Sequence, residues 1–379
     1  MNDAILNKVQ MLAEQNITDI ENFKKDGRKV VGLYCLYSPV ELVVAANGIP
    51  LTLCGTKNDP ITVAEEKLPR NLCPLIKSSY GFALSGTCPF FNFADFIVAD
   101  TTCDGKKKMF ELMQEIKPVH VLQLPQNQEK SSSLPLFRGE VEKMKSLIEH
   151  ETKVEITDDK IKKAISLMNR ERTAKKDLMD LAKLTPSPIT GTELITILFK
   201  TGFFANKEKG IEMLKEITSE YIKIHEEKKG PYNEKTKRIL LTGVPVGLGS
   251  DKVIRIVEEA GGSIVCFENC SGYKQAFTVN EEEDPITALA KQYLEIPCSV
   301  MSPNQKRFDL LDEMIEGFSV DGIIDLTWQA CHTYNIEAFK IAEVFQKEKR
   351  IPLLHLETDY SETDSEQLRV RIEAFLEMI

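Results

Sequence analysis

Short apolar runs alternate with amphipathic stretches over the first third of the 379-residue chain. Residues 38–48 and 105–116 have helical spacing, and Ser38 is the expected N-cap, Pro39 the first helical residue and Gly48 the stop. Runs rich in branched residues, typical of buried strands, lie at 28–35, 49–54, 95–100 and 119–125. This alternation predicts βαβ units and a parallel sheet.

The pattern becomes almost wholly helical from about residue 140 to 228, with a break at 185–191. It then returns to alternating strands and helices, with strands expected at 238–243, 263–269, 322–327 and 351–357. We therefore predict an α/β protein with two doubly wound, Rossmann- or flavodoxin-like parallel-sheet domains. These domains are expected at 1–140 and 231–379, with a helical section at 141–230 between them. No close internal repeat is visible, although both halves alternate in the same way.

Composition and charge narrow the class of protein. Hydrophobic residues make up 42% and charged residues 28%, as in soluble globular proteins. The net charge is −10 and there is no long basic run, which argues against a nucleic-acid partner. The short patch Lys106–Lys108 is interpreted as the solvated start of a helix. No apolar run approaches the roughly 20 residues of a membrane span, and the first 25 residues do not resemble a signal peptide. A cytoplasmic protein is therefore expected.

Nine cysteines are the main candidates for chemistry. Their number is odd and the expected compartment is reducing, so a disulfide framework is not predicted. There is no C-x-x-C pair, which argues against a zinc ribbon and against a thioredoxin-like site. Burial, catalysis, or a metal cluster assembled from distant parts of the chain are the remaining roles.

Several cysteines follow predicted strands, where open α/β sheets bind ligands. Cys54, Cys103, Cys270 and Cys331 come at or just after such strand ends. If the two domains face each other, these turns meet at one cleft.

Two further cysteines, Cys73 and Cys88, are each followed by proline, which readily starts a helix. A thiol at a helix start lies near the positive end of the helix dipole, which stabilises the metal-binding thiolate. Gly105 and Gly272 allow tight turns whose N–H groups can point at sulfur.

Other candidates have simpler interpretations. A lone cysteine is usually a packing residue, and we interpret Cys266 in this way and, more weakly, Cys35. His332 and His355 are interpreted as hydrogen-bonded structural residues, although either could be a ligand or a base. The loop 243–252 follows a strand and opens a helix but matches neither phosphate-binding motif.

The stretches YCLYSPVELVVAANGIPLTLC, LPRNLCP, DFIVADTTCDGKKKMFE and TWQACH resemble the 2-hydroxyacyl-CoA dehydratase family, which includes benzoyl-CoA reductase subunits. The resemblance covers nearly the whole chain. It implies that Cys73, Cys103 and Cys331 hold a [4Fe–4S] cluster with one open iron.

The stretches GTCPFFNFADF, CFENCSGYK and IPCSVMSPNQKRFDLL most resemble the double-cubane cluster protein branch of this family. That branch binds an [8Fe–9S] double cubane through six thiolates, which implies Cys88, Cys270 and Cys298 as the second set. One departure is Val300, where a C-S-C motif would place another cysteine. Cys35 and Cys54 also occur in the family's opening motif and are alternatives to Cys88 or Cys298.

The resemblance implies an oxidoreductase that transfers low-potential electrons to a small substrate under anaerobic conditions. It also implies a homodimer and an ATP-dependent iron–sulfur activator as electron donor. One alternative is a 2-hydroxyacyl-CoA dehydratase subunit, a lyase with a single [4Fe–4S] cluster that eliminates water by a radical route. A non-enzymatic electron carrier and a metal-free binding protein are further alternatives. No catalytic side chain is assigned.

Overall fold

The first α/β unit is built on a parallel sheet with strand order β2-β1-β3-β4 in the computed structural model, which describes residues 2–379. β1 and β3 are buried along their whole length, because both faces of a parallel sheet are covered. The strands are β1 (Val30–Tyr34), β2 (Ile49–Leu53), β3 (Phe96–Asp100) and β4 (Val119–Leu122). All of them fall where the apolar runs predicted strands.

Helices connect and cover this sheet. α2 is shorter than the helix predicted at 38–48: Pro39 is the N-cap, and the side chain of Ser38 makes no capping hydrogen bond. The helix ends early because Asn47 adopts a left-handed φ of 57° and the Gly48 N–H turns back to the Val43 carbonyl. The helices of this part are α2 (Val40–Ala45), α3 (Ile61–Ala64), α4 (Pro74–Ser85), α5 (Pro89–Phe93), α6 (Asp104–Met113) and α7 (Ser133–Thr152).

The second α/β unit repeats the strand order of the first, as β6-β5-β7-β8. β5 and β7 correspond to β1 and β3, so the two halves share a topology that the sequence alone does not reveal. The strands are β5 (Arg238–Gly243), β6 (Ser263–Phe267), β7 (Gly322–Trp328) and β8 (Leu353–Thr358). They are accompanied by α11 (Lys252–Glu259), η2 (Tyr273–Gln275), α13 (Gln305–Gly317), α14 (His332–Ile341), the π-helical η3 (Ala342–Glu348) and α15 (Ser365–Met378). The helix α12 (Pro285–Leu294) lies in the same part of the chain but packs against α7 of the first unit.

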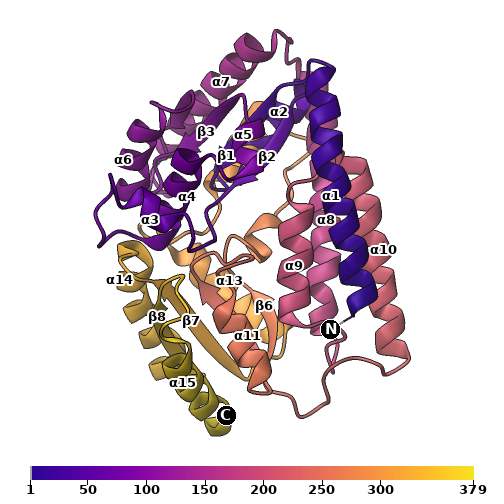
Figure 1. Ribbon diagram of the computed structural model, residues 1–379, viewed down its shortest axis with the longest axis vertical. Helices are drawn as coiled ribbons and strands as arrows, with labels where there is room; N and C mark the ends of the chain where they lie inside the picture. The colour runs from indigo at the N-terminus through magenta and orange to yellow at the C-terminus, as the bar shows by residue number, and fades with distance from the viewer. Residues whose placement is uncertain (1) are drawn as a thin grey trace.

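A group of long helices lies along one side of both units (Figure 1). It contains α8 (Asp158–Asp180), η1 (Leu181–Lys183), α9 (Gly191–Thr201) and α10 (Lys207–Glu226), and also α1 (Asp3–Lys25). Thr190 starts α9 with a complete capping box that includes Glu193. The first helix of the chain contacts both this group and the first sheet: Lys8 of α1 pairs with Glu220 of α10 at 3.4 Å, and Ile20 is buried in one cluster with Val30 of β1 and Ile49 of β2. The domain limits at 140 and 230 stay a prediction.

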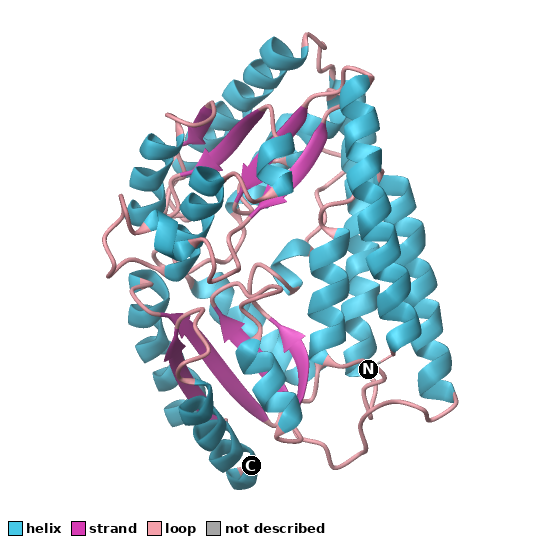
Figure 2. Ribbon diagram, in the orientation of Figure 1, coloured by secondary structure: helices cyan, strands magenta, loops and turns pink. Residues whose placement is uncertain are grey.

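The carboxyl ends of the two sheets face each other, as the strand arrows in Figure 2 show. Contacts between the facing loops hold this arrangement. The Tyr360 hydroxyl donates to the Gly55 carbonyl at 2.9 Å, and the Thr56 hydroxyl donates to the Leu248 carbonyl at 2.9 Å. The turns that carry the cysteines therefore border the space between the two units.

One of three apolar clusters joins the two units and the long helices, and a second lies between the first sheet, α7 and α12. A single cluster of buried side chains includes Ile5 of α1, Ile97 of β3, Ile195 of α9, Ile239 of β5 and Phe375 of α15. No helix within residues 2–379 is long and apolar enough to cross a lipid bilayer.

Candidate metal centre

Four of the predicted ligands occupy helix N-caps. Cys73, Cys88, Cys103 and Cys331 precede α4, α5, α6 and α14. Proline is the first residue of α4 and α5, as the C-P pairs predicted. The free N–H groups of a helix's first turn favour a thiolate at this position. The sequence therefore places these thiols where negative sulfur is best stabilised.

Cys73 and Cys331 come from different α/β units, and their thiols interact. The Cys73 thiol lowers the pKa of Cys331 to about 7, with help from the Tyr334 N–H at the start of α14. Cys103 also lies nearby: burial raises the pKa of its thiol, and the negative charges of Cys331 and Cys298 raise it further. The structure thus brings together Cys73, Cys103 and Cys331.

A second group of thiols contains Cys35, Cys270 and Cys298. Burial raises the pKa of Cys270, and the charges of Cys298 and Cys35 act on it as well. The charges of the same three thiols add to the effect of burial and raise the pKa of the Tyr37 hydroxyl. Cys298, the predicted ligand in the motif where Val300 replaces an expected cysteine, therefore lies within this group.

Lys106 is the cation of this region, and the sequence interpretation of it was wrong. Its side chain is not solvated but buried, and its Nζ lies 2.9 Å from the Cys35 sulfur. Burial raises the pKa of Cys35 to about 12, and Lys106 opposes this rise. Lys107 and Lys108 are exposed as expected. The ammonium group of Lys106 is placed to offset the negative charge of nearby thiolates.

Cys88 and Cys54 lie slightly apart. Cys88 accepts a hydrogen bond from the Phe91 N–H at 3.5 Å, and burial raises its pKa. The charges of Cys88 and Cys54 add to the effect of burial and raise the pKa of Tyr34, and both cysteines border the same cavity. Cys266 is buried within β6, where burial raises the pKa of its thiol and the charge of Arg238 opposes this rise. Its interpretation as a packing residue is confirmed.

Two cavities with several lining residues in common are bordered by some of these sulfurs. The inner one, of about 140 Å³, is bordered by Cys35, Cys54, Cys270 and Lys106. The outer one, of about 360 Å³, is bordered by Cys54 and Cys88 and shares the walls Phe199 and Phe203 with the inner one. Thiols and an ammonium group around an enclosed volume fit the needs of an anionic iron–sulfur cluster.

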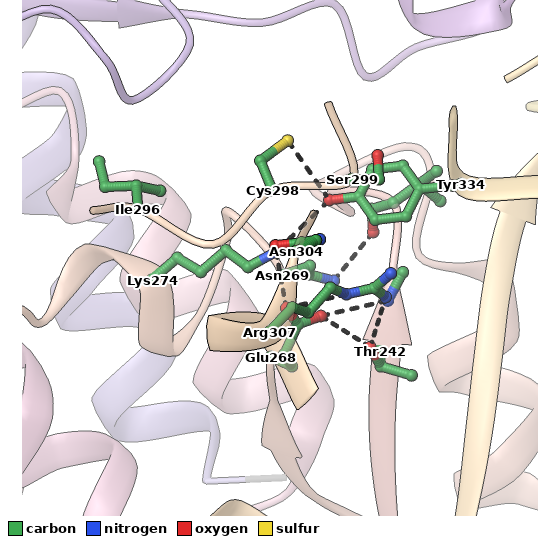
Figure 3. Close-up of polar contacts among 12 residues, drawn as sticks. Thr242, Glu268, Asn269, Lys274, Ile296, Cys298, Ser299, Asn304, Arg307 and Tyr334 are labelled. Atoms are coloured by element: carbon green, nitrogen blue, oxygen red, sulfur yellow. Dashed lines mark hydrogen bonds and ion pairs between the residues drawn. The ribbon is translucent and has the colours of Figure 1, made fainter. Parts of the chain in front are cut away.

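A buried ionic network, which sequence reasoning missed, supports the loop that carries Cys270 (Figure 3). The Glu268 carboxylate accepts from Lys274 at 2.6 Å and from the Thr242 hydroxyl at 2.7 Å, and it pairs with Arg307 at 3.3 Å. Burial alone would raise the pKa of Glu268, but Arg307 and Lys274 lower it to about 2. The only signal in the sequence was a Glu-Asn pair at the end of a predicted strand.

Tyr334 connects this network to the thiols. Its hydroxyl lies 3.5 Å from the Lys274 Nζ and 4.0 Å from the Cys298 sulfur (Figure 3). The network therefore holds the sulfur-bearing loops of the second unit in one arrangement.

His355 and the 243–252 loop have structural roles, whereas His332 is exposed at the start of α14 and its side chain makes no hydrogen bond within residues 2–379. His355 contacts the Thr327 hydroxyl at 3.0 Å, and Lys252 in the 243–252 loop pairs with Asp364. Gly243 has a φ of 105°, and a Cβ there would lie 2.0 Å from the Leu326 carbonyl oxygen. This glycine therefore serves strand packing.

Within residues 2–379, no three His, Cys, Asp or Glu side chains meet closely enough to hold a single metal ion. Cluster ligands differ from such a set, because each thiolate binds a different iron of the cluster.

Fold and site together define a class: an α/β protein with two facing sheets and a thiol-lined space between them. The sequence matches the family described as 2-hydroxyglutaryl-CoA dehydratase, D-component, over residues 35–379, and the chain belongs to this family. The resemblance stated from the motifs is thereby confirmed.

Named relatives cover almost the full length of the chain. A provisionally named dehydratase subunit of Escherichia coli strain K12, YjiM, is 40% identical over 99% of this chain and 98% of its own length. The (R)-phenyllactyl-CoA dehydratase beta subunit of Clostridium sporogenes is 27% identical over 95% and 94%, respectively. A benzoyl-CoA reductase subunit of Thauera aromatica is 21% identical over 92% and 89%. Members are thus dehydratases and reductases, which supports the prediction of an enzyme of one of these kinds.

Proposed function

We propose that the protein is an iron–sulfur reductase that uses an [8Fe–9S] double cubane to deliver low-potential electrons to a small substrate. The observation that carries the proposal is the number of thiols around one space. Cys35, Cys54 and Cys270 border one cavity, Cys73 interacts with Cys331, and the charges of Cys331 and Cys298 act on Cys103. One [4Fe–4S] cluster in this family would require only three thiolates from the subunit. The two groups are adjacent, because Cys103 of the first lies near Cys298 of the second.

The first ligand set in this proposal is Cys73, Cys103 and Cys331. The second set predicted from the sequence is Cys88, Cys270 and Cys298, and Cys35 is the alternative to Cys88. Two observations favour Cys35. It borders the inner cavity together with Cys270, and it adopts a φ of 69°, a left-handed conformation that costs energy for a residue with a side chain. Such strain at a candidate site supports a functional role.

The surrounding residues would hold the charge of the bound sulfurs. Lys106 provides a buried positive charge beside Cys35, and the starts of α4, α6 and α14 direct N–H groups toward the first set. Tyr360 joins the facing loops by its hydrogen bond to Gly55. When bound, a double cubane would supply electrons at low potential.

The second candidate function is that of a 2-hydroxyacyl-CoA dehydratase subunit with a single [4Fe–4S] cluster. The observation that favours it is the naming of relatives, among them the lactoyl-CoA dehydratase beta subunit of Anaerotignum propionicum. Such names also indicate enzymes of several subunits. A homodimer, an ATP-dependent iron–sulfur activator and a cytoplasmic location belong to the first proposal. A pure electron carrier would be a variant of it without turnover of a small molecule.

Iron and sulfide analysis of the anaerobically purified chain tests both functions. We expect about eight irons per chain for a double cubane, whereas about four would favour the dehydratase function. No iron after anaerobic preparation and reconstitution would overturn both.

Cysteine variants then assign the second ligand set. Cys35→Ser is expected to reduce the iron content by about half, whereas Cys88→Ser should leave it unchanged; the reverse result would restore Cys88 as the ligand. Cys266→Ala is the matched control, because this thiol lies within a strand of the core and away from the cavities.

A further inference from the structure

A third cavity lies beside the inner one, on the side of the long helices. It has a volume of about 90 Å³ and extends from Cys35 and Thr52 of the first unit to α8 and to Lys274 of the second. Cys35 and Lys175 border both this cavity and the inner one. A molecule bound here would therefore lie next to the candidate metal centre.

The wall of this cavity is strongly cationic. Among residues 2–379, the charged groups that border it are Glu171 and the cations Arg172, Lys175, Lys207 and Lys274. All four cationic side chains are at most 10% exposed, so water screens their charges only weakly.

Carboxylates near the cavity are shared between these cations. Glu171 serves both Lys175, at 2.9 Å, and Lys207, at 3.4 Å. The carboxylate that holds Lys274, Glu268, also serves Arg307. With Arg172 paired to Glu41, the four cations that border the cavity have three carboxylate partners, and one of these, Glu268, is shared with a fifth cation. The region carries excess positive charge.

Lys207 is the least compensated of these groups. Burial lowers its pKa, and Glu171 opposes this effect only in part while the like charge of Lys175 adds to it. The Glu171 oxygen that faces Lys207 makes no hydrogen bond within the described chain. An additional anion in the cavity would stabilise this ammonium group.

An unused hydroxyl adds an independent observation. Ser38 borders the cavity and is only 2% exposed, and its hydroxyl has no hydrogen-bond partner within residues 2–379. A buried hydroxyl without a partner costs free energy, so a bound acceptor would satisfy it.

From these contacts we infer that the cavity is a binding site for a small oxyanion, an organic carboxylate or an inorganic oxyanion. The inference rests on the proposed function, because it names the substrate class that would be held beside Cys35. Cations and a free hydroxyl converge on a volume of the size that a small molecule needs.

Calorimetric titration of the anaerobically purified protein tests the inference, with sodium acetate and sodium nitrate as separate probes in chloride-free buffer. We expect saturable binding of at least one probe, and the stronger one tells organic from inorganic oxyanions. Lys207→Gln should weaken binding at least about tenfold, as for a lost charge-assisted contact, and Ser38→Ala should weaken it less.

The matched control is Lys209→Gln on the same helix, which pairs at the surface with Asp19 and should leave binding unchanged. No saturable binding, or equal weakening by the Lys207 and Lys209 variants, would overturn the inference. Circular dichroism of each variant verifies folding.

Iron is counted in the same samples, so that the two proposals fail separately. Absent binding with a full iron content removes the oxyanion site and leaves the reductase proposal standing. Binding by a protein that holds no iron removes the reductase proposal and leaves the oxyanion site standing.

Discussion

At the residue scale, the two sheets each bury an aspartate in the third strand of the matching order. Asp100 ends β3 and Asp325 lies in β7, and the carboxylate oxygens of both have no hydrogen-bond partner within residues 2–379. Burial raises the pKa of each to about 6. The charges of Arg307 and His355 partly offset the rise in the pKa of Asp325.

The raised pKa of Asp325 makes a prediction about stability. In the unfolded chain this carboxyl ionises near pH 3.8, so between there and about pH 6 only the folded state retains its proton. The stability contribution of the protonated group is complete below pH 3.8 and is lost as the pH rises through 6. We therefore compare the free energy of unfolding of Asp325→Asn with that of wild type at two pH values. This difference should favour the variant by roughly 1–3 kcal/mol more at pH 7.5 than at pH 4.5.

Denaturant unfolding of both proteins at the two pH values measures this difference. Because each variant is compared with wild type at the same pH, the fixed cost of burying an amide cancels. An equal effect of the substitution at both values would contradict the raised pKa.

At the element scale, short helices in the first unit pack at backbone distance. A Cβ at Gly81 of α4 would lie 1.9 Å from the carbonyl oxygen of Pro60, which precedes α3. This contact positions α4, whose first residue follows Cys73. The backbone conformation at Gly81 does not require glycine, so the need for glycine here comes from packing alone.

Gly81→Ala should therefore destabilise the protein by about 1–3 kcal/mol, as expected for overpacking against the backbone. Gly139→Ala is the matched control: it also lies within a helix, α7, but a Cβ there meets nothing within 4 Å. The control should stabilise the protein by about 0.5–1 kcal/mol through helix propensity. Chemical denaturation checks both, and a loss of stability in the control would argue against the packing explanation.

At the scale of the whole molecule, the two units and the long helices share one apolar core. The contact between the facing loops adds to this connection, because Tyr360 both donates to Gly55 and packs edge-on against Trp328 at 5.0 Å. Trp328 is the only tryptophan of the chain and lies in the second unit. Its fluorescence therefore reports on one part, whereas far-UV circular dichroism reports on all helices.

We expect these two signals to follow the same transition in guanidinium, because a shared core unfolds as one unit. Tyr360→Phe removes one hydrogen bond and leaves the Gly55 carbonyl unpaired, so both transitions should shift together by about 1 kcal/mol. A shift of the fluorescence transition alone would show that the second unit unfolds independently.

The strands and the positions of several candidate ligands could be predicted from the sequence because their causes are local. Branched apolar runs predict buried strands, and a cysteine before proline predicts a helix N-cap, as Cys73 and Cys88 show. The end of α2 depended on the left-handed Asn47, a conformation that the sequence did not indicate.

By itself, the sequence determined the α/β class, the family and the thiols at strand ends and helix starts, since these depend on periodicity and on neighbouring residues. Only the tertiary structure decided which thiols meet, because Cys73 and Cys331 are separated by most of the chain and are joined by the facing of two sheets. It likewise buried Lys106 beside Cys35. Burial and charge pairing depend on residues distant in sequence, and no local pattern contains them.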